Sequence, residues 1–303
     1  MAAQYAEQEI GIVLRPAYEG SNIRSWIGFR HLMYLGQEAL LGWLRRQNLG
    51  PQRLYQEHGL CLEIVEASFA FIGLVEIDDE ITAHVVPGGL NRLRVVLRAH
   101  RGDEHVLASK GWFTIALVRR ERSRMLPKLP DWLETAIVDD LTQARITPLD
   151  ARVESLHSPG NPFEWSWRAR YFHCHYSDRL QFSAYLRALE EITDRFLEAR
   201  GLSIPAMLKE RSWIPVVSRA RVQLLCDAYL DETIDATFAV DDVFKASAYI
   251  ARMQCNVQRR ASKVRTAIAE IVHGYAISEG AAAGQLAQLD AVVVDRLLGR
   301  ARS

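Results

Sequence analysis

The chain has 303 residues, of which 49% are hydrophobic and 24% charged, a composition typical of a folded globular protein. Basic and acidic residues number 37 each, so the net charge is zero, which argues against a nucleic-acid-binding surface or attraction to anionic lipid. The four cysteines, Cys61, Cys174, Cys226 and Cys255, match no zinc motif or disulfide framework. With no signal peptide and no run of about 20 apolar residues, the sequence predicts a cytoplasmic protein without a membrane span.

The first half of the chain reads as one helix followed by strands. Residues 34–50 carry apolar side chains at helical spacing, and Gly50 supplies a helix stop. The strand-like runs after it extend from Cys61 around an acidic turn at 78–80, and then over residues 93–99 and 106–118.

A proline-containing stretch separates this half from the second. It holds Pro127, Pro130, Pro148 and Pro162, with an expected linker helix at 133–144. We therefore divide the chain as follows: a first unit at 1–125, a linker at 126–161, a second unit at 162–278, and a C-terminal helix at 279–303.

The second half repeats the order of the first. Residues 163–172 alternate like a buried strand, and residues 185–201 form the second helical stripe. Strand-like runs then start at Trp213, with an acidic turn at 231–232. The two copies align when Tyr34 is matched with Tyr185. One long helix with about four nearby strands in each copy predicts an α+β fold with antiparallel sheets.

The segment HCHYSDRLQFSAY at 173–185 resembles the signature of the 4-hydroxybenzoyl-CoA thioesterase-like branch of the hotdog superfamily. That signature runs Asp-x-Asp-x-x-Gly-His-Val-Asn-x-x-x-Tyr and leads into the central helix. His173 and His175 fall on its two aspartates and Tyr185 on its tyrosine. In the first copy Tyr34 matches the tyrosine, and Arg24 takes the second aspartate position. The resemblance implies a tandem double hotdog, two antiparallel sheets each wrapping a long central helix.

The resemblance places candidate catalytic groups around the start of the second helix. His175 and His173 are candidate bases, and Asp178 would orient the base or activate water. Glu190, on the helix, would pair with a histidine, as in hotdog dehydratases. The alternatives are that the histidines are packed or surface groups, that Asp178 caps the helix, and that Glu190 lies on a solvated face.

Substrate-binding candidates come from both copies. They are the signature tyrosines Tyr185 and Tyr34, together with Arg24 and His31 of the first copy. The basic and imidazole groups would serve a second site or hold an acidic head group. His31 as an ordinary packed residue is the alternative reading.

These features predict an acyl thioester hydrolase acting on acyl-CoA or acyl carrier protein, in fatty-acid or polyketide metabolism. Helix N–H groups would stabilise the oxyanion. The alternatives are a dehydratase or cyclase acting on a β-hydroxyacyl or polyketide thioester, and a non-catalytic acyl-binding protein. We expect no metal, and no cofactor other than the CoA or phosphopantetheine that belongs to the substrate. A monomer and a homodimer are both compatible with two fused copies.

Overall fold

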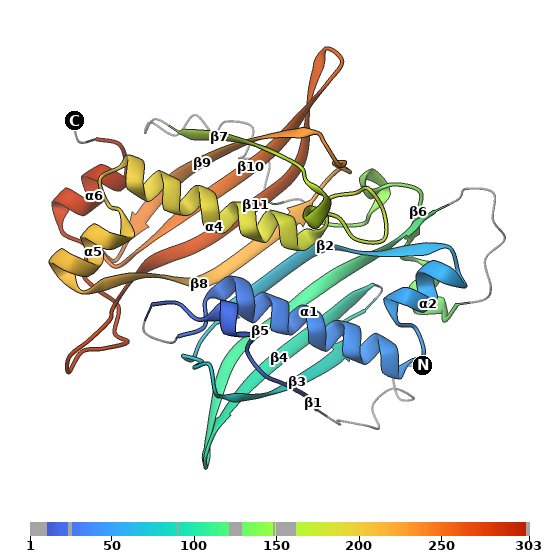
Figure 1. Cartoon of the computed structure of the whole chain (residues 1–303), viewed down its shortest axis with the longest axis horizontal. Coiled ribbons are helices and arrows are strands. Elements are labelled where there is room, and N and C mark those ends of the chain that lie inside the picture. Colours follow the sequence, from blue (N-terminus) through green and yellow to red (C-terminus); the bar gives the residue numbers. More distant parts are fainter. Residues whose placement is uncertain are drawn as a thin grey trace.

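The computed structural model describes residues 11–23, 26–89, 91–120, 129–147, 149 and 162–300. Each half contains a long helix, a short helix after it and four long antiparallel strands, and the second half ends in one further short helix (Figure 1). The first half comprises β1 (Ile12–Leu14), η2 (Tyr18–Gly20), α1 (Phe29–Arg46), α2 (Pro51–Gln56), β2 (Leu60–Phe71), β3 (Glu80–Pro87), β4 (Arg92–Arg101) and β5 (Glu104–Arg119). The second comprises β7 (Phe163–Arg168), η5 (Tyr171–His173), α4 (Phe182–Ala199), α5 (Ile204–Arg211), β8 (Trp213–Leu224), β9 (Thr233–Phe244), β10 (Ala248–Arg259), β11 (Ser262–Ile277) and α6 (Ala291–Leu297).

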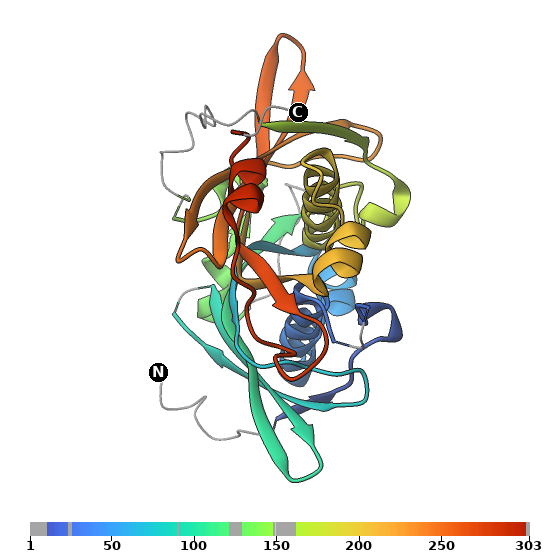
Figure 2. The same cartoon turned by 90° about the vertical axis from the view of Figure 1, so that its left-hand side faces the viewer.

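The strands form one continuous sheet in the order β1-β3-β4-β5-β2-β8-β11-β10-β9-β7. The halves meet where β2 pairs antiparallel with β8, from Glu66 opposite Gln223 to Ala70 opposite Arg219. Both long helices lie on the same face of this curved sheet (Figure 2). The predicted α+β double hotdog is confirmed, and its two antiparallel sheets are the two halves of one sheet.

Apolar stripes and small residues hold the long helices against the sheet. On α4 the predicted stripe, including Leu189, Ile192 and Phe196, is almost completely buried. On α1 a glycine permits close approach, because a Cβ at Gly36 would lie 3.1 Å from the Phe69 ring. Within the sheet, a Cβ at Gly111 would come within 2.3 Å of a backbone oxygen on β2, so this strand position accepts no side chain.

The structure corrects the alignment of the two copies by two residues. Trp26 forms an isolated bridge with Glu76, and Arg179 forms the equivalent bridge with Tyr229. Since α1 begins at Phe29 and α4 at Phe182, the residue equivalent to Tyr185 is Leu32, and pairing it with Tyr34 was wrong. The error comes from the residue at which the first helix ends. Asn48, with φ of 60°, takes the left-handed position that Gly201 occupies with φ of 68° in the second copy. Matching Gly50 with Gly201 therefore shifted the two copies by two residues.

The linker and the C-terminus are less helical than expected. The predicted helix at 133–144 is replaced by the short α3 (Asp131–Glu134), by β6 (Ile137–Val138), which pairs parallel with β5, and by η3 (Leu141–Gln143). Within 279–303, helix α6 covers only Ala291–Leu297. The boundary at 125–126 and much of the 126–161 linker lie outside the described residues.

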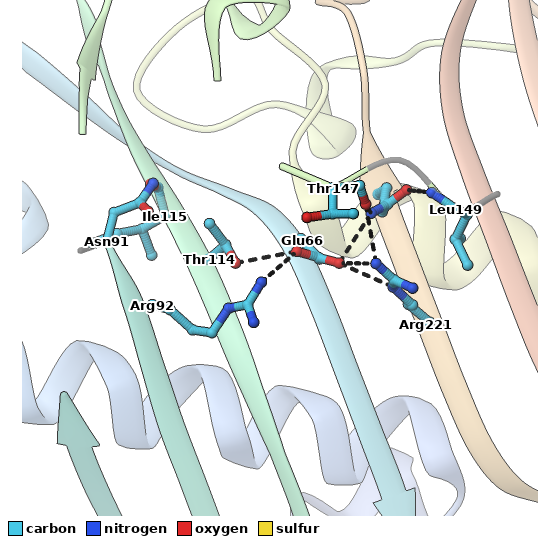
Figure 3. A network of polar contacts seen from close by, with 9 residues as sticks. Glu66, Asn91, Arg92, Thr114, Ile115, Thr147, Leu149 and Arg221 are labelled. Atoms are coloured by element: carbon cyan, nitrogen blue, oxygen red, sulfur yellow. Dashed lines mark hydrogen bonds and ion pairs between the residues drawn. The ribbon is translucent and has the colours of Figure 1, made fainter. Parts of the chain in front are cut away.

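A buried polar network fastens the linker to the junction of the halves (Figure 3). Its centre is Glu66 on β2, which is fully buried. The Glu66 carboxylate accepts hydrogen bonds from Arg221 at 2.6 and 2.9 Å, Gln223 at 2.9 Å, Thr114 at 3.3 Å and Arg92 at 3.4 Å. Gln223 also donates to the carbonyl of Thr147 at 2.6 Å and accepts from the amide of Leu149 at 2.7 Å. One carboxylate therefore connects β4, β5, β2, β8 and the linker.

Candidate active site

Two cavities are lined by residues from both halves of the chain. Each combines the segment that precedes one long helix with the facing side of the other long helix. The Asp194 cavity, of about 660 Å³, is lined by groups that include Asn22, Gly28, Phe29, Arg30, Phe71, Val75, Glu190, Thr193, Asp194, Val216 and His273. The His175 cavity, of about 700 Å³, is lined by groups that include Tyr34, Gln37, Glu38, Leu41, Glu63, Phe172, His175, Gln181, Ser183 and Arg187. Both are in the size range of small-molecule sites.

The corrected alignment makes these cavities equivalent by internal symmetry, but their chemistry differs. Asn22 of the Asp194 cavity stands where His175 stands in the other. The helix position of Asp194 is Leu41 in the other copy, and that of Glu190 is Gln37. At these two helix positions, only the Asp194 cavity has carboxylates.

Asp194 combines access to the cavity with an unusual electrostatic environment. Its side chain is exposed, yet it lines a cavity walled by protein from both halves. The surrounding protein removes much of its hydration and is the main cause that raises the pKa of Asp194 to about 6, and the charges of Glu190 and Glu191 add to the effect. Among the described residues, no cation is a cause of this shift in pKa. A carboxylate with a pKa near the working pH is well suited to general base catalysis.

The second carboxylate of this cavity is neutralised. Glu190 accepts a hydrogen bond from Arg30 at 2.5 Å, which joins α4 to the first turn of α1. Arg30 also lies over the Tyr34 ring at 5.5 Å, and it is only 16% exposed. Arg30 also lies 3.8 Å from Glu19, a third carboxylate that lines this cavity. These ion pairs fix the start of α1 opposite Asp194, whereas among the described residues Asp194 has no ion pair of its own.

The start of α1 forms the opposite wall of the Asp194 cavity. Its N-cap residue is Gly28, which has no side chain to cap the helix, and the first-turn N–H groups have no partners within the helix. The Gly28 amide donates to Gly20 at 3.1 Å, which fixes the entry of the chain into the helix. A Cβ at Gly28 would lie 3.1 Å from Oδ1 of Asn22, another lining residue. Free N–H groups and the helix dipole there favour a developing negative charge.

In the His175 cavity, His175 is exposed, and the surrounding protein and the nearby Arg187 lower its pKa. Gln181 is the N-cap residue of α4, and Tyr34 donates to the carbonyl of Ser183 at 3.2 Å. Burial raises the pKa of Glu63 to about 8, so this carboxyl is protonated at neutral pH. The cavity is polar but has no ionised, desolvated carboxylate comparable to Asp194.

The structure separates several groups that the sequence had placed together. His175 and Glu190 line different cavities, so the expected pairing of this histidine with this glutamate does not form. The side chain of His173 accepts a hydrogen bond from the Arg170 amide at 2.9 Å and packs on Trp167. Asp178 is exposed and does not cap α4, whose N-cap residue is Gln181.

The predicted substrate-binding residues are also dispersed. Tyr185 is buried in the core and lines neither cavity. His31 is buried behind η2, where its Nε2 lies 3.2 Å from Glu19, and burial lowers its pKa. Tyr34 lines the His175 cavity, and Arg24 lies outside the described residues.

Sequence reasoning missed Asp194 and His273. Asp194 lies one helical turn after Glu190, on a face that a single copy would leave in solvent. The signal that could have found it is this pair of carboxylates one turn apart, beside the apolar stripe of the helix. Its significance depends on knowing that the other half of the chain covers that face.

Solved structures with this fold cover nearly the whole chain. A protein assigned as an oleoyl thioesterase from Lactobacillus plantarum matches 87% of this chain and 94% of its own, with a TM-score of 0.63 and 11% identity. The 12:0-ACP thioesterase from Umbellularia californica matches 88% of this chain and 97% of its own, with a TM-score of 0.60 and 10% identity. An acyl-ACP thioesterase from Bacteroides thetaiotaomicron matches 87% and 96%, with a TM-score of 0.55 and 10% identity.

The chain is therefore a double hotdog protein with the fold of these thioesterases. The sequence itself matches no model of a known protein family and no curated protein. In the described part of the chain, no helix is long and apolar enough to cross a membrane. Among the same residues, no group of three or more histidine, cysteine, aspartate or glutamate side chains is arranged to hold a metal ion.

Proposed function

We propose that this protein is an acyl thioester hydrolase that acts on acyl-CoA or acyl carrier protein substrates in the Asp194 cavity. The observation that carries the proposal is the position of Asp194, with its pKa near 6, across a cavity of about 660 Å³ from the uncapped start of α1. The fold shared with thioesterases supports the same reaction class.

In this mechanism Asp194 takes a proton from a water molecule that attacks the thioester carbonyl carbon. The first-turn N–H groups of α1, beside Gly28 and Phe29, stabilise the oxyanion of the tetrahedral intermediate. Collapse of the intermediate breaks the C–S bond, and the proton held by Asp194 passes to the leaving thiolate. The products are a carboxylic acid and a thiol. The Arg30–Glu190 ion pair holds the start of α1 and helix α4 in fixed positions on the two sides of the cavity.

The reaction is tested by thiol release from a panel of acyl-CoA and acyl carrier protein thioesters. We expect wild type to release thiol and Asp194→Asn to lose at least about 100-fold in kcat/KM, the usual contribution of a general base. Glu198→Gln is the matched control, because Glu198 is an exposed carboxylate on the same helix. His175→Ala tests the other cavity, and we expect it to retain activity.

Other outcomes would contradict the proposal in defined ways. Loss of activity in His175→Ala but not in Asp194→Asn would move the site to the His175 cavity. Formation of an enoyl product without thiol release would identify a dehydratase. Stabilisation by acyl-CoA with neither reaction would identify an acyl-binding protein.

A further inference from the structure

Three polar aromatic side chains gather where the Asp194 cavity meets the sheet. His273 lines the cavity from β11, and Tyr249 is its direct cross-strand partner on β10. The rings of these two residues stack with centroids 4.8 Å apart. Tyr275, two residues after His273 on β11, lies with its ring 6.0 Å from the His273 ring. We call these three residues the His273 cluster.

The cluster is buried without hydrogen-bond partners. Tyr249 and Tyr275 are 0% exposed and His273 is 3% exposed. Among the described residues, neither tyrosine hydroxyl nor Nδ1 of His273 has a hydrogen-bond partner. Buried polar groups in proteins are almost always paired, because an unpaired one forfeits its hydration without compensation. His273 itself lines the cavity, and the two tyrosines lie against its ring behind the cavity wall. Three unpaired polar groups gathered at one cavity wall indicate a site for a polar group of a ligand.

The cluster is next to the reactive carboxylate. His273 and Asp194 line the same cavity. Burial is the main cause that raises the pKa of both tyrosines, and the charge of Asp194 is a further cause in the same direction. A ligand group held by the cluster would therefore be close to the carbonyl that Asp194-activated water attacks. Because His273 and Asp194 share this cavity, we expect the recognised oxygen to lie near the thioester end of the acyl group.

The cluster is electrically neutral, which limits the kind of atom that it can recognise. Burial lowers the pKa of His273 to about 3, so its imidazole is uncharged at pH 7, and both phenols remain protonated. A carboxylate bound here would face Asp194 without a cation of its own, since Arg30 is paired with Glu190. Neutral donors and acceptors instead match a hydroxyl or keto oxygen.

We infer that the His273 cluster binds a hydroxyl or keto oxygen near the thioester end of the acyl group, so that the enzyme prefers 3-hydroxyacyl or 3-oxoacyl thioesters to plain alkyl thioesters. This inference rests on the proposed hydrolase function. A site built to hydrogen-bond a substrate oxygen discriminates strongly against the analogue without it, because its own buried groups are then left unpaired.

The test compares octanoyl-CoA, 3-hydroxyoctanoyl-CoA and 3-oxooctanoyl-CoA, which share a chain length, by thiol release. We expect wild type to favour at least one oxygenated substrate by about ten-fold or more in kcat/KM. Tyr249→Phe and Tyr275→Phe keep the ring and remove only the hydroxyl, and we expect them to bring that ratio towards one. Tyr171→Phe is the matched control, because Tyr171 is 85% exposed, and its ratio should equal that of wild type.

The failure of this inference and that of the proposed function give different results. Equal hydrolysis of all three substrates, or a ratio unaffected by both cluster variants, would overturn the inference and leave the hydrolase intact. If the protein hydrolyses none of these three substrates and no other acyl thioester, the proposed function is overturned. Thermal unfolding of the free protein gives a further readout: removing an unpaired hydroxyl should leave the melting temperature equal or higher. A clear decrease in both cluster variants would mean that the hydroxyls are bonded in the free protein, and would contradict the inference.

Discussion

Replacing Glu66 with glutamine should destabilise the protein substantially, because this carboxylate connects four strands and the linker. Glutamine keeps the shape but removes the charge that balances Arg221 and Arg92. Breaking a buried ion pair on one side costs about 3–5 kcal/mol. Since the side chains of Arg221 and Arg92 remain 27% and 40% exposed, water can partly hydrate them, and we expect a loss of about 2–3 kcal/mol.

Urea unfolding measures this loss directly. With a slope of about 3 kcal/mol per molar urea, the midpoint should fall by roughly 0.7–1 M. The control is Glu80→Gln, because Glu80 pairs with Arg15 on the surface at 3.3 Å and such exposed pairs contribute about 0–1 kcal/mol. If Glu66→Gln shifts the midpoint no more than Glu80→Gln does, the network does not fasten the junction of the halves.

Asp194→Asn should stabilise the fold at pH 8 by an amount on the order of 1 kcal/mol, discounted for the exposure of the side chain. Because the pKa of Asp194 is raised in the folded state, the ionised carboxylate destabilises the fold above about pH 6. The gain in unfolding free energy from Asp194→Asn should therefore disappear below about pH 4, where the carboxyl is protonated in both the folded and the unfolded state. An equal gain at pH 4 and pH 8 in urea unfolding would contradict this. Gly111→Ala should cost about 3 kcal/mol or prevent folding, because its Cβ would overlap a backbone oxygen of β2 at 2.3 Å. The control is Gly42→Ala on α1, whose nearest neighbours are atoms of the flexible Ile12 side chain, at 3.2 Å and beyond. We expect it to be neutral or stabilising, and similar urea midpoints for the two variants would contradict the packing argument.

The order of elements could be predicted because it depends on local periodicity. The stripe of α4, with Leu189, Ile192 and Phe196, reports its buried face directly, and alternating runs report the strands. The prediction of a linker helix was wrong, although residues 133–144 have a helical composition. The pairing of β6 with β5 overrides this local preference.

The site could not be predicted in the same way, because it is assembled from both halves. The two-residue error in matching Tyr34 with Tyr185 made Tyr34 the counterpart of Tyr185 in place of Leu32. It also made Arg24 the counterpart of His175 in place of Asn22. Nothing local to Asp194 shows that the start of α1 faces it across a cavity. The pairing of β2 with β8, which creates that arrangement, joins strands more than 100 residues apart.

The most direct test of the account is the pH dependence of kcat/KM for thiol release by the wild-type protein. If Asp194 is the general base, kcat/KM should rise ten-fold per pH unit below about pH 6 and level off above it, because only the ionised carboxylate can accept a proton. Asp194→Asn should remove the rise together with most of the activity. A rise through pH 6 that persists in Asp194→Asn, or a profile that is flat from pH 5 to 8, would contradict the assignment of the reaction to Asp194.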